Sequence, residues 1–391
     1  MNKRRAIFIC NALDDSTRLE RQIFSDSPAA SKKTILMAQA LSSIGERVAI
    51  VSMGRGQVNG SGKYFPAKVK RINGILTVYC PFSHYQVLSQ FLSLLFLPYL
   101  LCRLNGFQGK TTAIFYNRTT AYIPSLLVSV FCGYSRVLDL EDGDLPRARW
   151  TFYELYLAFK RFLYDGLCSQ GTILACMALR NKKLIHNSLC YYGAVENFKR
   201  EVSWKPNKKI KFLLGGTVAV NTGALALIDA ITYLREFPEN WCEILEFVIT
   251  GKGDCIGTFE ALSDDCRPPI VTVMPLLTDI EYSDVVRSCH VGLALKPSLG
   301  GLANTTFPSK VIELSSEGLL VLTTNISDVK QVLGLGALYL EDDSSESIVE
   351  CIRWIVENPD EAELLAICGQ SNVRLRCELN IAGHSLAEFI F

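Results

Sequence analysis

The sequence predicts an α/β protein with two successive domains, each built on a mainly parallel sheet. Short apolar segments of strand length alternate with segments of helical periodicity along most of the chain. The alternation stops once, in a polar stretch near the middle, and then restarts. The 391 residues are 49% hydrophobic and 20% charged, which is enough apolar material for two full cores.

The first half contains the first series of strand and helix signals. We expect strands at residues 5–10, 47–52, 75–80, 112–116, 136–140 and 172–177. We expect helices at residues 29–43, 87–104, 121–131 and 150–167. The long polar stretch between the first strand and the first helix, residues 11–28, is predicted to be a functional loop. Strands joined by helices of this length form right-handed βαβ units and a parallel sheet.

The second half repeats the alternation after residues 194–209, which are rich in Lys, Arg, Glu and Asn and form the expected linker. We expect strands at residues 210–214, 244–250, 270–274, 291–295, 319–323 and 337–340. We expect helices at residues 222–234, 280–287, 309–317, 345–357 and 360–391. The predicted divisions are residues 1–200, 201–369 and a terminal segment, 370–391. Parallel sheets bind ligands at the carboxyl ends of their strands, so the site is expected in a cleft between the domains.

The net charge of +1 conceals a strong asymmetry between the two halves. Residues 1–200 contain 26 Lys and Arg against 12 Asp and Glu, a net charge of +14. Residues 201–391 contain 14 basic and 27 acidic residues, a net charge of −13. Either the first half faces an anionic partner, such as a membrane surface, a lipid phosphate or nucleic acid, or the opposite charges help the domains to dock. Both explanations can hold together. No nucleic-acid-binding motif is found, so no nucleic-acid partner is expected.

Residues 87–104 are almost wholly apolar and approach the length of about 20 residues that spans a bilayer. Gln90, Ser93 and Pro98 interrupt them, so we predict a buried or membrane-surface helix rather than a span. The 14 cysteines form no Cys-x-x-Cys pair, which is typical of reduced thiols in a cytoplasmic protein. No signal peptide is expected, because the first apolar run is too short. The four histidines are isolated, and no metal site is predicted.

The segment TFPSKVIELSSEG, residues 306–318, carries the most informative pattern. Pro308 is placed where a helix begins, and Lys310 adds a positive charge to the first turn. Glu313 lies three residues further on, on the same helical face. A lysine for a diphosphate and a glutamate for ribose hydroxyls would form a nucleotide-sugar site. An ordinary surface Lys–Glu pair is the alternative.

This pattern resembles the donor-binding core of GT-B glycosyltransferases and is most similar to the retaining family GT4. The segments on both sides resemble that family in the same order, and they are residues 215–230, 247–253, 282–295 and 341–359. The resemblance covers most of residues 209–360. It implies two Rossmann-like domains that face each other across a cleft, with the terminal helix returning to the first domain.

The resemblance implies that a UDP- or GDP-sugar is the donor substrate, with no tightly bound cofactor and no metal. Glu313 would bind the ribose, and Lys310 would lie near the diphosphate and stabilise its charge. The other expected donor-binding residues are Gly215, Gly216, Thr217, Lys252, Pro275, Leu276, Asn304, Thr305 and Thr306.

Two departures from the family pattern concern the sugar and the diphosphate. Many family members carry a glutamate eight residues before the ribose glutamate, where this chain has Thr305. Many also carry an arginine and a lysine after the first glycine loop, but residues 217–223 here contain no basic residue. Lys310 and Lys252 are therefore the cations left for the diphosphate.

Acceptor-side residues are expected in the first half. Glu141 and Asp142, in an acidic loop after a strand, would orient the acceptor hydroxyl as catalytic residues, or they belong to a solvated turn. Lys32 or Lys33, near the start of a helix, would meet a phosphate or be solvated.

The predicted function is hexosyltransferase-like transfer, with retention, to a glycan or lipid-linked acceptor in surface polysaccharide or glycoconjugate synthesis. The expected location is the cytoplasm, with peripheral contact to an anionic membrane. A sugar-nucleotide epimerase is one alternative, although it would need histidines that are scarce here. A catalytically weak GT-B protein that acts as a binding partner is the other, and Thr305 favours it.

Overall fold

The structure is a computed structural model that describes residues 4–58, 62–106, 109–141, 152–180, 187–198, 204, 209–275, 277–299 and 305–391. The chain forms two compact units, one of Met1–Glu196 with Glu378–Phe391 and one of Asn197–Cys377. Each unit contains a parallel sheet, and the predicted α/β fold class with two Rossmann-like domains is confirmed. The structure divides the chain at 196/197 and 377/378, whereas the sequence placed the divisions at 200 and 369.

The sheet of the first unit has the order β12-β11-β10-β9-β1-β3-β7-β6. Its strands are β1 (Arg4–Cys10), β3 (Arg47–Ser52), β6 (Lys68–Ile72), β7 (Ile75–Tyr79), β9 (Lys110–Tyr116), β10 (Ser135–Leu140), β11 (Gly171–Leu174) and β12 (Ser188–Cys190). The pairs are parallel except that β6 runs antiparallel to β7. The chain builds outward from β1 in one direction and then crosses to β9, so the order reverses between β1 and β9.

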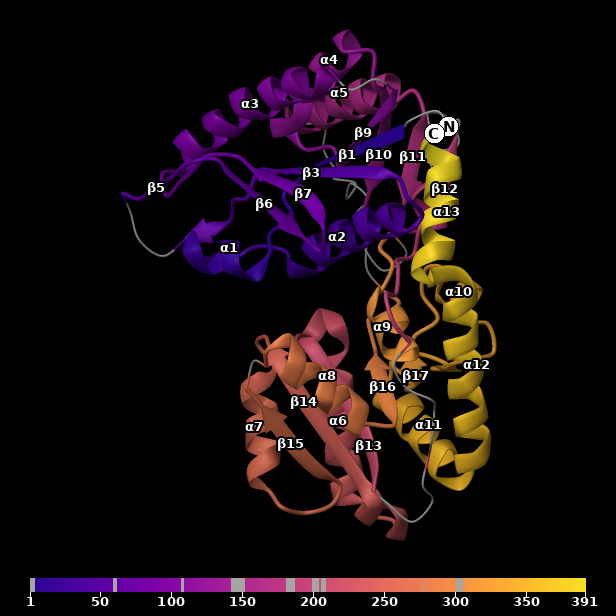
Figure 1. Cartoon of the computed structure of the whole chain (residues 1–391). Helices are drawn as coiled ribbons and strands as arrows, with labels where there is room; N and C mark the ends of the chain where they lie inside the picture. Colours follow the sequence, from indigo (N-terminus) through magenta and orange to yellow (C-terminus); the bar gives the residue numbers. More distant parts are fainter. Residues whose placement is uncertain are drawn as a thin grey trace. The chain divides into compact units, whose positions relative to one another are not determined.

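Helices cover both faces of this sheet (Figure 1). On one face lie α2 (Pro28–Ser43) and α13 (Leu379–Ile390), which pack so closely that a Cβ on Gly383 would lie 2.1 Å from the Ala40 carbonyl oxygen. On the other face lie α3 (Gln86–Arg103), α4 (Ile123–Phe131) and α5 (Phe152–Leu167). The terminal helix α13 therefore belongs to the core of the first unit.

The polar stretch of residues 11–28 is not a loop throughout, as the sequence had suggested. It contains α1 (Asp15–Glu20) and β2 (Ile23–Ser25), which pairs with β4 (Gln57–Val58). The Asp14 side chain caps α1 by accepting a hydrogen bond from the Thr17 backbone. Arg21 is fully buried and donates to the carbonyl oxygens of Gly54 (2.5 Å) and Cys80 (2.9 Å). A second short pair joins β5 (Tyr64–Phe65) to β8 (Phe82–Ser83).

The sheet of the second unit has the order β15-β14-β13-β16-β17-β18, and all its pairs are parallel. Its strands are β13 (Ile210–Thr217), β14 (Leu245–Lys252), β15 (Ile270–Met274), β16 (Val291–Ala294), β17 (Leu320–Thr323) and β18 (Leu338–Tyr339). This is the strand order of dinucleotide-binding sheets, and it reverses between β13 and β16. The reversal defines where a ligand crevice is expected.

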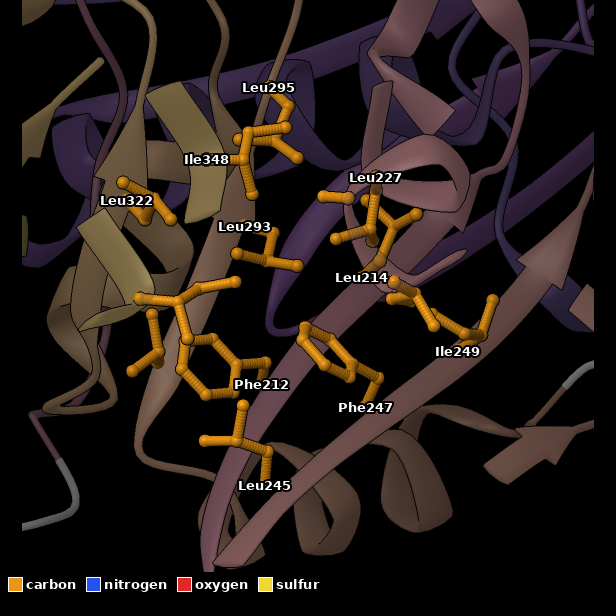
Figure 2. Close-up of a cluster of buried hydrophobic side chains, with 14 of the residues drawn as sticks. Phe212, Leu214, Leu227, Leu245, Phe247, Ile249, Leu293, Leu295, Leu322 and Ile348 are labelled. Atoms are coloured by element: carbon orange, nitrogen blue, oxygen red, sulfur yellow. The ribbon is translucent and has the colours of Figure 1, made fainter. Parts of the chain in front are cut away.

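The core of the second unit forms where α6 (Ala224–Glu236) and α11 (Ser345–Glu357) cover one face of the sheet (Figure 2). Phe212 and Phe247 stack there with ring centroids 5.1 Å apart. On the opposite face, α9 (Lys310–Ser316) packs directly on β16, since a Cβ on Gly292 would lie 2.8 Å from Leu314 Cδ1. The remaining helices are α7 (Ile256–Asp264), α8 (Asp279–Ser288), α10 (Val329–Leu333) and α12 (Pro359–Cys377).

Two helix ends predicted from the sequence can be compared with the structure. Gly318 has φ +82° and its N–H donates to the Ser315 carbonyl, which is the expected glycine stop after α9. The predicted helix 360–391 is two helices, α12 and α13, because the backbone of Glu378 leaves the helical region with ψ 137°.

Candidate functional site

The candidate site lies at the carboxyl ends of β13 and β16, where the strand order of the second unit reverses. Residues Gly215, Gly216 and Thr217 form the end of β13, and Lys252 ends β14 beside it. Helix α9, with Lys310 and Glu313, follows the loop after β16. Sequence positions almost 100 residues apart are therefore brought to one edge of the sheet.

Gly216 and Lys310 are in direct contact. Gly216 has φ +90°, and a Cβ there would lie 2.8 Å from Lys310 Nζ. The ammonium group of Lys310 therefore rests against the backbone of the glycine turn, whose positive φ favours glycine. The sequence predicted both residues for the diphosphate without predicting that they touch.

The neighbouring turn is built in the same way. Gly251 has φ +130°, and a Cβ there would lie 1.9 Å from the Gly216 carbonyl oxygen. Thr217 and Lys252 are register partners in β13 and β14, and both are exposed. The two glycine-rich turns thus pack backbone to backbone, and Thr217 and Lys252 are the exposed residues beside them.

Among the described residues, Glu313 on the same helix is the opposite charge that acts on Lys310. In the part of the chain that the structure describes, burial and the charge of Glu313 act on this amine, and no hydrogen bond to it is found. Burial lowers the pKa of Lys310, and Glu313 only partly opposes that effect. A bound phosphate would stabilise the charged amine. Helix α9 has only seven residues and Ser309 makes no capping bond, so the lysine charge is a stronger anion attractant here than the helix terminus.

Lys296 is a second cation at this edge, and the sequence analysis did not select it. It follows β16 by two residues, and its Nζ donates to Thr306 Oγ1. The Thr324 hydroxyl holds its backbone by donating to the Lys296 carbonyl at 2.6 Å. The missed signal was a lysine placed directly after an apolar strand, at the end of the strand where ligands bind.

Tyr282 of α8 is a further residue that the sequence analysis did not assign to the site. A Cβ on Gly215 would lie 2.7 Å from its hydroxyl oxygen, so the phenol packs on the glycine turn. Burial raises the pKa of Tyr282, and the charge of Glu313 raises it further. The phenol is therefore a neutral hydrogen-bonding group beside the glycines.

The other predicted donor residues are placed less centrally. Pro275 is exposed after the edge strand β15, and its carbonyl oxygen accepts a hydrogen bond from Thr250 Oγ1 at 3.1 Å. Thr305 and Thr306 are half-buried just before α9. Leu276 and Asn304 lie outside the described residues.

In the first unit, two residues predicted for the acceptor side, Lys33 and Glu141, belong to an ion-pair cluster. Lys33 Nζ lies 3.0 Å from the buried Asp139 carboxylate and also pairs with Glu141. Burial opposes the charge of Lys33, but Asp139 and Glu141 together raise its pKa above the ordinary value. Burial also raises the pKa of Asp139, and Lys33 opposes this. Asp142 lies outside the described residues.

This cluster changes the interpretation of two candidates. Lys33 neutralises two carboxylates, so it is a poor choice for the phosphate-binding role that the sequence suggested. The backbone N–H of Glu141 donates to Asn117 Oδ1 at 2.8 Å, which fixes the carboxyl end of β10 next to that of β9. Within the described residues, no group of three or more His, Cys, Asp or Glu is arranged to hold a metal ion.

No protein-family model matches the sequence, and no curated protein matches it. The structure is similar to a glycosyltransferase from Rickettsia africae ESF-5, with a TM-score of 0.67 and 13% identity over 100% of this chain and 98% of that one. It is similar to the UDP-forming α,α-trehalose-phosphate synthase from Burkholderia xenovorans, solved with glucose-6-phosphate, with a TM-score of 0.69 and 12% identity over 99% and 100%.

A third similar structure is HepE from Anabaena, solved in complex with UDP, with a TM-score of 0.64 and 12% identity over 98% of both chains. The likeness extends over nearly the whole length of all three proteins. It shows that this chain has the GT-B fold of two Rossmann-like domains.

Proposed function

We propose that this protein transfers a sugar from a nucleoside-diphosphate sugar and binds the donor at the carboxyl ends of β13 and β16. The observation that carries the proposal is the contact between Lys310 Nζ and Gly216 at the strand-order reversal. A half-buried amine on a glycine turn, with Glu313 as the opposite charge acting on it among the described residues, fits a diphosphate better than it fits an ordinary solvated position. The GT-B fold of the similar structures supports the same class of reaction.

In this proposal Lys310 binds the diphosphate and stabilises the charge that develops as the glycosidic bond breaks. The backbone N–H groups of the glycine turn approach the same phosphates, as glycine permits. Lys296, held by Thr306, and the exposed Lys252 supply further positive charge. These cations compensate for the basic residues that are missing after the first glycine loop.

Glu313 is proposed to accept hydrogen bonds from the ribose hydroxyls, because it lies three residues beyond Lys310 on α9. The turn after β15, at Pro275 and Leu276, would flank the base. Residues Asn304, Thr305 and Thr306 would face the transferred sugar. UDP is the first nucleotide to test, since HepE was solved with UDP and the Burkholderia enzyme is named as UDP-forming. GDP is the second.

The finer parts of the proposal concern chemistry and location. Transfer with retention would have the diphosphate leave on the face that the acceptor attacks, where the leaving group itself takes the acceptor proton. The protein then contributes positioning and the exclusion of water. A glycan or lipid-linked acceptor and a cytoplasmic site of action are proposed with it. All 14 cysteines are free thiols, which suits a reducing compartment.

The test is a titration of the wild-type protein with UDP, GDP and their sugars, followed by an assay of nucleoside-diphosphate release. We expect the protein to bind one of the two nucleotides and to release that nucleoside diphosphate slowly from the corresponding nucleotide sugar. Lys310→Met and Glu313→Gln should weaken binding. Lys330→Met and Glu361→Gln, two exposed residues of the same unit, are the matched controls. Binding without any release or transfer would leave the catalytically weak binding partner as the better description.

A further inference from the structure

The three helices α3, α4 and α5 of the first unit expose a broad apolar surface, here called the three-helix face. They lie in one layer on one side of the sheet, opposite α2 and α13 (Figure 1). Helix α4 packs against both α3 and α5. On α3 and α4 the exposed fraction is 59% for Phe91 and 89% for Phe131. On α5 it is 95% for Phe152 and 72% for Phe162. Phenylalanines this exposed on adjacent helices mark an interaction surface rather than scattered surface residues.

Helices α3 and α4 carry large apolar side chains on their outer side as well as on their packed side. Phe91 of α3 and Phe131 of α4 are exposed. The packed sides contain both serines and leucines, which are Ser89, Ser93, Leu97, Leu101, Ser125, Leu126 and Ser129. Surface helices of soluble proteins normally turn their apolar side to the core. Apolar side chains this exposed on the outer side, beyond those needed for the core, are expected where a helix lies against lipid.

The charge of the sequence that forms this surface favours an anionic partner. Residues 47–138, which include α3 and α4, contain ten Lys and Arg and no Asp or Glu. Two of these cations, Lys68 and Lys70, are paired with carboxylates of the α1 region. On α5, Asp165 is paired with Arg118 at 2.9 Å, and the half-buried Glu154 is the other carboxylate. A second copy of the same face would oppose like charges across the interface. A bilayer with anionic lipids offers apolar depth and negative charge together.

We propose that the three-helix face docks the protein on the surface of a bilayer that contains anionic lipids. Among the described residues, Gln86–Gly106 is the helix that is long and apolar enough to cross a membrane. However, Pro98 lies inside it, and its Ser89, Ser93 and Leu97 are buried in the packing of the first unit. The helix therefore lies in the plane of the interface with its outer face in contact with lipid. This inference uses only the first unit and does not depend on donor binding.

The test is cosedimentation of the full chain with vesicles of phosphatidylcholine alone and with phosphatidylglycerol added. Binding should require the anionic lipid and weaken as salt is raised. Phe91→Glu combined with Phe131→Glu should weaken partitioning roughly tenfold or more. Both side chains are exposed, so the fold should be retained. Leu335→Glu combined with Leu364→Glu, at exposed apolar positions of the second unit, should change nothing.

A single-residue probe gives the depth of docking. Phe91→Trp should show a blue-shifted emission with anionic vesicles and be quenched by brominated acyl chains, since Phe91 lies on the outer face of α3. No vesicle binding by the wild-type protein would overturn the proposal. The proposal would also be overturned if sedimentation showed a dimer of the wild-type protein and a monomer of the Phe131→Glu variant, because the three-helix face would then be a protein interface. Nucleotide binding, measured without vesicles, should be the same in all these variants, so the two proposals can fail separately.

Discussion

Substitution of Lys310 by methionine tests whether this lysine binds the ligand or stabilises the fold. The side chain keeps its apolar volume against Gly216 but loses the charge. A hydrogen bond to a charged group contributes about 1.5–3 kcal/mol, so nucleoside-diphosphate affinity should fall about 10- to 150-fold. Because burial outweighs the charge of Glu313 at this amine, the free energy of unfolding of the ligand-free protein should not fall. Calorimetric titration with UDP or GDP, together with urea unfolding, measures both quantities.

The pH dependence of the same lysine gives an independent check. Burial lowers the folded-state pKa of Lys310 below its ordinary value of 10.5. The unfolded chain therefore binds more protons in the range between these two values, and the ligand-free protein should gain stability there as pH rises. A bound diphosphate favours the charged amine, so binding should take up protons in that range. Titrations in buffers of different ionisation enthalpy report the uptake, and Lys310→Met should abolish it.

Two outcomes would refute this reasoning. Equal nucleotide affinity in wild type and Lys310→Met would show that the lysine does not meet the diphosphate. A large loss of stability in ligand-free Lys310→Met, with no loss in the Lys330→Met control, would show that the amine has a structural partner.

Three further predictions test other parts of the structure. Gly216→Ala should destabilise the protein by about 1–2 kcal/mol because of its positive φ, and should weaken nucleotide binding because its Cβ meets Lys310; Gly257→Ala, with open space around it, is the control in urea unfolding and calorimetry. Glu313→Gln should weaken binding of a nucleoside diphosphate but not of inorganic pyrophosphate, since only the former carries a ribose; equal losses for both ligands would contradict the ribose assignment. Lys33→Met should cost about 3–5 kcal/mol of stability at pH 7 by leaving Asp139 buried without its counterion. This loss of stability should become smaller as the pH falls from 7 towards the ordinary pKa of aspartate, and it should also be smaller in the double variant with Asp139→Asn. Chemical denaturation at pH 7 and at the lower pH measures it, and an equal loss at the two pH values would refute the prediction.

Local signals were sufficient to predict most of the fold. The central strands are buried on both faces, so they read as continuous apolar runs, and β13 and β14 were found within a few residues. The glycine at position 318 predicted the end of α9, and in the structure it has the left-handed conformation that glycine adopts readily. The part that was missed depends on tertiary contacts. Helix α1 has a polar sequence and strand β2 has only three residues, and the segment is held in place by Asp14 and the buried Arg21.

The site was predictable where residue type and position both carry information. Gly216 and Lys310 each had a pattern of their own, and the fold brought them into contact. Tyr282 could not be recognised locally, because its importance arises from packing on Gly215. Lys296 had a local signal, its place just after an apolar strand, but its importance depends on the strand order. Lys33 and Glu141 were found separately, but the sequence does not show that they neutralise each other.

The most direct test of the central claim is hydrogen exchange of the wild-type protein with and without a saturating nucleoside diphosphate. With the nucleotide that binds, slower exchange is expected in peptides that cover residues 214–218 and 305–317, where the glycine turn and α9 meet the ligand. The Lys310→Met protein should show little of this protection at the same concentration. No protection of these peptides by UDP or GDP, or the same protection in Lys310→Met, would contradict the claim that the donor binds between β13 and α9.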